Sequence, residues 1–154
     1  MTSGGEPHTP FRPVDPTTFA GHRMPASVPA GLRLELSRAR LLDGKEAEFD
    51  EWMQMRHDRY AECIETLPTE HAAFEATFKH VEADGSVWMY HVSVIGENGS
   101  GLDTTIPVDA AHEAWARRTK ERGWEELEPT FMLAPQHILD AMATWGRTGA
   151  VAPS

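Results

Sequence analysis

The sequence of 154 residues contains one cysteine, Cys63, and no long apolar run. A single thiol excludes an internal disulfide framework, a cysteine-rich zinc site and a Cys-x-x-Cys redox pair. No apolar stretch approaches the length of a transmembrane helix, and the N-terminus lacks the apolar region of a signal peptide. These absences predict a cytoplasmic protein that neither spans nor binds a membrane.

Positive charge is also scarce, because 14 Lys and Arg residues face 24 Asp and Glu residues and give a formal net charge of −10. Such a chain repels the phosphates of nucleic acids and the surface of an anionic membrane. The charge therefore argues against both as partners. Hydrophobic residues make up 40% of the sequence, which is enough for the core of one globular domain.

Common catalytic and metal-binding motifs are absent as well. The sequence has no His-Glu-x-x-His or His-x-His, and the glycine-rich stretch 96–101 lacks the Walker pattern. No nucleophile elbow supports Ser-His-Asp catalysis. We therefore expect no metal and no organic cofactor. One alternative stays open, in which Glu75, His91 and His112 converge as carboxylate and imidazole ligands of a metal ion.

The chain divides into three parts by composition. Residues 1–31 carry many of the eleven prolines, which predicts an extended arm. Apolar residues recur in this arm and favour its docking on the body or on a partner subunit; they are Phe11, Val14, Phe19, Met24 and Val28. Residues 32–146 have the periodic pattern of one α+β domain, and 147–154 form a tail.

The periodicity within the domain predicts the order strand, helix, strand, strand, helix, strand. The first strand is Leu32–Ser37, and Asp43 with Glu46 in capping-box spacing predicts one long amphipathic helix that ends at Pro68. The later elements are a helix that follows Pro107, is capped by Asp109 and stops at Gly123, a strand over 127–133, and a short helix from Ile138 towards Trp145. This is the ferredoxin-like βαββαβ order.

The two middle strands form a hairpin around Asp84-Gly85. A two-residue loop would place Glu75 on the face away from His91, whereas a three-residue loop over 83–85 places both on one face. We predict the three-residue loop because it separates a polar from an apolar face. The polar face then holds Glu75, Thr77, His91 and Ser93, and the apolar face holds Phe74, Ala76, Phe78, Tyr90, Val92 and Val94.

In a ferredoxin-like fold the helices cover one face of the sheet and leave the other bare. Leu32, Leu34 and Leu36 are expected to face the helices, and Arg33, Glu35 and Ser37 are expected on the opposite side. A bare face with large apolar side chains is a larger patch than monomers tolerate. We therefore expect a homodimer, in which two sheets pack face to face and enclose a cavity.

Three residues are candidates for catalysis. His91 suits a general base near neutral pH, although a buried structural histidine is the competing interpretation. Glu75 either forms an ion pair or lines a wet pocket as an acid/base group. His112 lies one turn before Trp115, where a surface histidine is the alternative. The candidates for substrate binding are Glu35, Thr77, Met89, Ser93 and Trp115.

Several segments resemble a bacterial family of uncharacterised proteins with the dimeric α+β-barrel architecture. They are 36–46, 51–53, 66–75, 84–90, and the group Asp109, His112 and Trp115. The resemblance spans about residues 32–142 and leaves the arm uncovered. It implies a ferredoxin-like homodimer, and the wider superfamily includes cofactor-free monooxygenases, polyketide cyclases, isomerases, lyases and haem-binding proteins.

Two classes of function agree with these observations. The first is an enzyme, expected in secondary metabolism, that converts a small apolar or aromatic substrate by acid/base chemistry without an organic cofactor. The second is a non-catalytic dimer that binds a ligand in the same cavity. Inward-facing carboxylates favour the enzyme, because a carrier of apolar molecules has little need for them. A metal-dependent enzyme is the third alternative.

Overall fold

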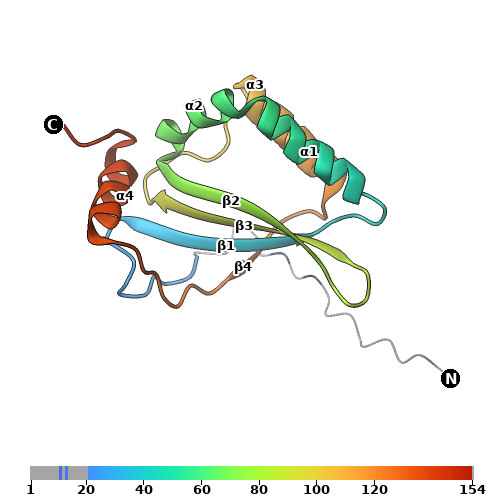
Figure 1. The fold of residues 1–154 in the computed structure, drawn as a ribbon, viewed down its shortest axis with the longest axis horizontal. Helices are drawn as coiled ribbons and strands as arrows, with labels where there is room; N and C mark the ends of the chain where they lie inside the picture. The colour runs from blue at the N-terminus through green and yellow to red at the C-terminus, as the bar shows by residue number, and fades with distance from the viewer. Residues whose placement is uncertain (1–10, 12, 14–20, 154) are drawn as a thin grey trace.

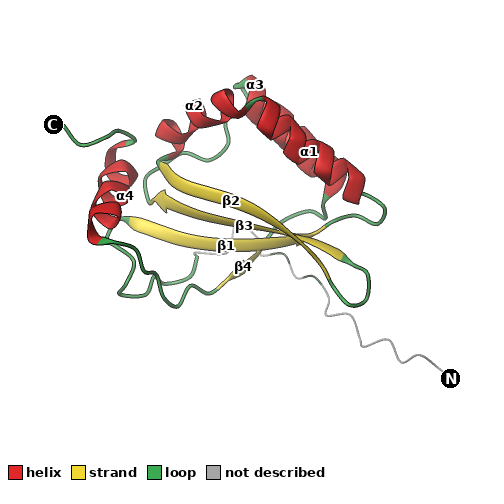
Figure 2. Cartoon of the chain, in the orientation of Figure 1, coloured by secondary structure: helices red, strands yellow, loops and turns green. Residues whose placement is uncertain are grey.

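The computed structural model describes residues 11, 13 and 21–153, which form an α+β fold with one four-stranded antiparallel sheet (Figures 1 and 2). Its elements are β1 (Leu32–Arg40), α1 (Glu46–Asp58), α2 (Tyr60–Glu70), β2 (Ala72–Val81), β3 (Val87–Gly96), α3 (Pro107–Thr119), β4 (Glu125–Leu127) and α4 (Gln136–Thr148). The strand order β2-β3-β1-β4 is compatible with a ferredoxin-like fold, so the predicted fold class is confirmed. Within the described ranges, no helix is long and apolar enough to cross a membrane.

The β2–β3 hairpin has the predicted three-residue loop. Val81 pairs with Val87, and the Glu82 N–H donates to the Ser86 carbonyl at 2.8 Å, which leaves 83–85 as the loop. Gly85 closes it in the left-handed region, with φ of 85°. Thr77 therefore lies opposite His91, and Glu75 lies opposite Ser93. The predicted register is confirmed.

The first helical region differs from its prediction in two respects. The single helix expected up to Pro68 is divided at Arg59 into α1 and α2. Helix α1 packs against α3, and α2 packs against β2 (Figure 1). The helix continues through Pro68 to Glu70, because a proline in the last turn removes only one backbone donor. His71 then ends it in the left-handed conformation, with φ of 54°.

The predicted capping box is also wrong. Lys45 is the N-cap of α1 and makes no side-chain capping hydrogen bond. Asp43 instead accepts a hydrogen bond from Arg40 at 3.2 Å, and Gly44 turns the chain at a φ of 75°. A carboxylate near a guanidinium can bind that group instead of the backbone N–H groups at the helix N-terminus, and the spacing of residues in the sequence does not show which partner it binds.

The C-terminal half also differs from its predicted boundaries. Asp109 is the third residue of α3 rather than its N-cap, since Pro107 takes the first position, and α3 ends at Thr119 instead of Gly123. The last strand is only Glu125–Leu127 rather than 127–133. Pro129 cannot donate to a ladder, so pairing does not extend through it.

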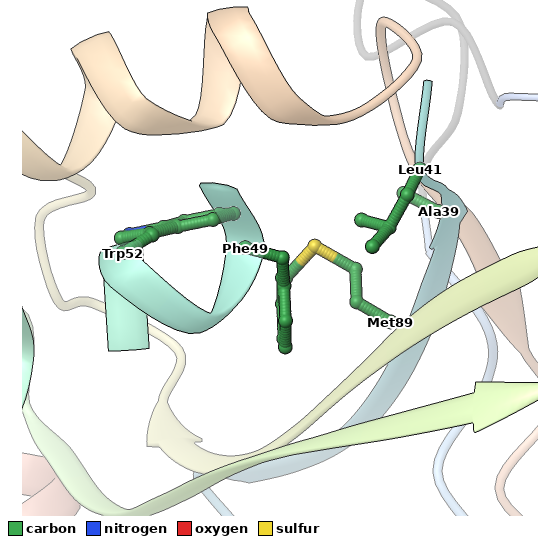
Figure 3. Close-up of a cluster of buried hydrophobic side chains, with 5 residues drawn as sticks. All are labelled: Ala39, Leu41, Phe49, Trp52 and Met89. Carbon is green, nitrogen blue, oxygen red and sulfur yellow. The ribbon is translucent and has the colours of Figure 1, made fainter. Parts of the chain in front are cut away.

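The face of the sheet that meets the helices is the opposite of the expected one. Ala39 and Met89 point towards Phe49 and Trp52 on α1 and form a buried cluster with Leu41 (Figure 3). Side chains alternate along a strand, so the polar residues of the hairpin lie on this covered side too. The prediction failed because alternation separates two faces but does not say which one the helices cover.

Among the described residues, the arm and α4 cover the ends of the apolar face. Leu32 and Val94 form a second cluster with Val28, and Met24 of the arm and Met142 of α4 pack against it. Phe11 packs edge-on against Trp88, with ring centroids 5.6 Å apart. Between these contacts Phe74 and Phe78 remain 46% and 58% exposed. Val14 and Phe19, which we also expected to dock, lie outside the described residues.

Helix α4 stands at one end of the sheet (Figure 1). Two glycines, one on β3 and one on α4, approach each other closely there. A Cβ atom on Gly96 would collide with the backbone carbonyl of Gly146. We expect Gly96→Ala to lower the free energy of unfolding by at least about 2 kcal/mol, because neither backbone can move away easily. Urea denaturation measures this change.

Gly101→Ala is the matched control, because a Cβ there has nothing within 4 Å. Its unfolding midpoint should remain close to that of the wild type. Equal midpoints for the two variants would contradict the close approach of α4 to β3.

Candidate functional site

A cavity of about 420 Å³ lies between the polar face of the sheet and the helices. It is lined by Glu35, Ser37, Trp52, Met53, Glu70, Ala72, Glu75, Thr77, Met89, His91, Ser93, Ile95, Ser100, Gly101, Leu102, His112 and Trp124. A neighbouring cavity of similar size opens between α1, α2 and β2 and shares Met53, Glu75 and Thr77 with it. Seven of the eight predicted site residues line the first of these two cavities, which is called the main cavity below.

Four polar side chains form a connected group in this cavity. Arg56 on α1 donates to Glu75 Oε1 at 3.1 Å, while Glu75 Oε2 lies 3.5 Å from His91 Nε2. Thr77 Oγ1 is hydrogen-bonded to His91 Nδ1 at 3.4 Å. Because Nε2 faces a carboxylate, we assign the proton of neutral His91 to Nε2, which leaves Nδ1 as an acceptor.

Burial lowers the pKa of His91, and the charge of Arg56 adds to the effect. The negative charges of Glu75 and Glu35 oppose this shift without cancelling it. The imidazole is therefore neutral at pH 7 and able to accept a proton. Arg56 was not among the predicted site residues, although its interruption of the apolar stripe of α1 was a visible signal.

His112 is the second imidazole of the cavity. Trp52 Nε1 donates to His112 Nδ1 at 2.9 Å, so the ring proton is on Nε2. Burial lowers the pKa of His112 to about 3, with smaller contributions from the charges of Arg56 and His91. His112 is consequently a neutral hydrogen-bond donor over the whole physiological range of pH.

Glu70, the last residue of α2, is a cavity residue that sequence reasoning missed. Burial, together with the neighbouring charges of Glu75 and Asp109, raises its pKa to about 7. The only opposing contributions come from Arg56 and the Thr66 side chain. A carboxyl group with this pKa changes its protonation near neutral pH, which is typical of functional sites.

The predicted substrate-binding residues divide into two groups. Glu35, Thr77, Met89 and Ser93 line the cavity, and Glu35 is held at 2.9 Å by Arg33. Trp115 does not line it; this side chain packs against the first buried cluster, and the Arg118 guanidinium lies 4.1 Å from its ring centroid.

Across the part of the chain that the structure describes, no three His, Cys, Asp or Glu side chains are placed so that they could hold a metal ion. Glu75 and His91 are close to each other, whereas Nδ1 of His112 is engaged by Trp52. What the arrangement offers is a proton acceptor, a neutral donor and carboxylates around a small cavity.

Comparison with protein families matches residues 32–140 to a family of unknown function (DUF6176). No curated protein and no solved structure matches the chain. The matched segment includes every residue that lines the cavity.

The raised pKa of Glu70 makes a prediction about stability. The native state binds the proton of Glu70 more tightly than the unfolded chain does, so this group lowers the stability as pH rises from about 4.5 to about 7. Glu70→Gln should therefore stabilise the protein relative to the wild type by about 1–2 kcal/mol at pH 8, after allowance for solvent screening, and much less at pH 5. Urea unfolding at both pH values measures the difference.

Both proteins keep His112, so its own pH dependence cancels in this comparison. Glu65→Gln, an exposed position on the same helix, is the control and should give the same small difference at both pH values. A wild-type advantage that grows with pH would contradict the assigned environment of Glu70.

Proposed function

The chain belongs to the DUF6176 family of unknown function, and we propose that it is an enzyme that moves a proton on a small molecule in the cavity. The observation that carries the proposal is the neutral His91 imidazole, placed between the Glu75 carboxylate and the Thr77 hydroxyl. A buried base of this kind next to a carboxylate is the usual arrangement for general-base catalysis.

In the proposed reaction, His91 Nδ1 removes a proton from a carbon atom next to a carbonyl group of the substrate. The hydrogen bond from Thr77 is long, at 3.4 Å, so a substrate can replace it at little cost. The positive charge that forms on the imidazole is stabilised by Glu75, 3.5 Å away. Arg56 donates to the other oxygen of Glu75 at 3.1 Å and fixes the orientation of the carboxylate.

Removal of this proton leaves negative charge on the carbonyl oxygen of the substrate. His112 is the residue proposed to stabilise it, because its Nε2–H is a donor that does not change protonation near pH 7. Return of the proton to another atom completes an isomerisation or a ring closure. The proposal needs no organic cofactor, since residues of the chain supply both the acceptor and the donor, and the compartment proposed is the cytoplasm.

The test is exchange of deuterium into substrate analogues. We expect the wild type to catalyse exchange of the α-hydrogens of aryl ketones in D₂O, with 4-phenyl-2-butanone, 1-indanone and acetophenone as probes. Glu75→Gln and His91→Gln should each lower the rate by a factor of about 10²–10⁴. Proton NMR follows the loss of the α-hydrogen signals.

His80→Gln is the control, because His80 lies on the same hairpin with its side chain 59% exposed. Its exchange rate should equal that of the wild type. If folded Glu75 and His91 variants keep the full rate, or if no ketone exchanges, the cavity is better explained as a non-catalytic binding site.

We also propose that the apolar face of the sheet is the interface of a homodimer. This face carries Leu36, Phe74, Ala76, Phe78, Tyr90 and Val92, between the ends covered by the arm and α4. Exposure of 46% and 58% for two phenylalanines is unfavourable in water, and a second sheet removes it. The dimer assembles back to back in this arrangement, with one cavity on the outer side of each sheet.

Size-exclusion chromatography with light scattering tests the dimer. We expect twice the chain mass of 17.1 kDa at micromolar concentration. A Phe74→Glu/Phe78→Glu variant should elute as a monomer, whereas Lys79→Glu, on the same strand but on the helix side, should remain dimeric. A monomeric wild type would contradict this interface.

A further inference from the structure

Negative charge is in excess at the inner end of the cavity. A recess of about 40 Å³ there is lined by Glu70, Glu75 and Asp109, and Arg56 is the only Lys or Arg among its lining residues. The main cavity has three glutamates and no Lys or Arg in its lining. Ionised together, the three carboxylates of the recess exceed its positive charge by two.

Two of these three carboxylates have strong partners. Arg56 donates to Glu75 at 3.1 Å, and Asp109 accepts the backbone N–H of Asp103 at 3.0 Å. Glu70 has no ion pair with any Lys, Arg or His of the described chain. Among the described residues, Glu70 and Asp109 therefore both lack a cationic partner, and Glu70 also lacks a backbone N–H donor.

The histidines of the cavity cannot balance it either. His112 stays neutral because its pKa is about 3, and burial lowers the pKa of His91 as well. An anionic ligand would meet three carboxylates and no unpaired cation, which is unfavourable in a buried site. A cationic ligand would instead supply the positively charged partner that Glu70 lacks.

The side chains that line the main cavity next to the recess are suited to the apolar part of a ligand. Trp52, Met53 and Leu102 line the main cavity, together with Trp124. A volume of 40 Å³ admits a group of the size of one or two waters, such as an ammonium head, and 420 Å³ admits an aromatic ring with a short chain. The net charge of −10 also favours the approach of a cation.

We propose that the natural ligand is an arylalkyl amine, whose ammonium group binds Glu70 in the recess while its ring lies among Met53, Leu102 and Trp124. This inference rests on the proposed function and names its class of substrate. The ammonium group fixes the ligand at one end, and His91 acts on a carbon atom next to a carbonyl group that the natural ligand carries further along its chain. Glu70 is thus an anchor for the substrate and not the proton acceptor.

Isothermal titration calorimetry on the full chain at pH 8 tests the anchor with three ligands of one shape. They are 3-phenylpropylamine, 3-phenylpropan-1-ol and 3-phenylpropanoate. We expect the amine to bind at least tenfold more tightly than the alcohol, and the carboxylate to bind more weakly than both. A hydrogen bond between charged groups is strong enough to give this ratio.

Glu70→Gln should lower the affinity for the amine about tenfold or more and leave the affinity for the alcohol unchanged. Glu65→Gln, exposed on the same helix, is the matched control and should bind all three ligands as the wild type does. Equal affinities for the three ligands, no binding of the amine, or full amine affinity in Glu70→Gln would each overturn the inference.

The outcome for the anchor is separate from that for the proton transfer. Calorimetry requires no turnover, so its failure removes the amine from the proposal and leaves deuterium exchange to decide the role of His91. Conversely, tight amine binding together with an absence of exchange would establish Glu70 as the anchor of a binding protein.

Discussion

The ion pair between Arg56 and Glu75 joins the two layers of this fold through the cavity between them. A carboxylate on the covered face of a sheet is costly unless a cation meets it, and Arg56 on α1 is that cation. The pair leaves the second oxygen of Glu75 next to His91. The orientation of α1 over the sheet and the environment of the imidazole therefore depend on the same contact.

The sequence was sufficient to predict how the hairpin pairs. Asp84-Gly85 and the strict alternation around it allowed only two registers, and burial costs favoured the one observed. It was not sufficient to predict which face the helices cover. The polar face suggested the open side, but α1 and α3 direct Arg56 and His112 inward, where Arg56 pairs with Glu75 of the sheet and His112 accepts a hydrogen bond from Trp52 of α1. Such matching arises between segments far apart in the chain and leaves no periodic signal in either.

Glu70 was missed for a related reason. In sequence it is a polar residue near the end of a helix, which is ordinarily a solvated position. Its environment comes from Glu75 on the next strand and from Asp109, almost forty residues further along. Local spacing likewise suggested Asp43 as a helix cap, whereas Arg40 binds it in the structure. The predicted residues that do line the cavity are mostly strand residues. Period-two alternation determines which strand side chains share a face of the sheet, whereas helical spacing determines the direction of a helix side chain less narrowly.

The two faces of the sheet meet different physical requirements, and this explains why the cavity persists. Complete packing of α1 against the polar face would bury Glu35 and Thr77 among side chains unable to satisfy all their hydrogen bonds. A cavity that admits water or a ligand avoids this cost. The opposite face has the reverse problem, because the exposure of Phe74 and Phe78 to water is unfavourable. Stability favours closing the apolar face and leaving the polar one open to small molecules. The proposed site can thus be maintained by the same alternation that holds the sheet together.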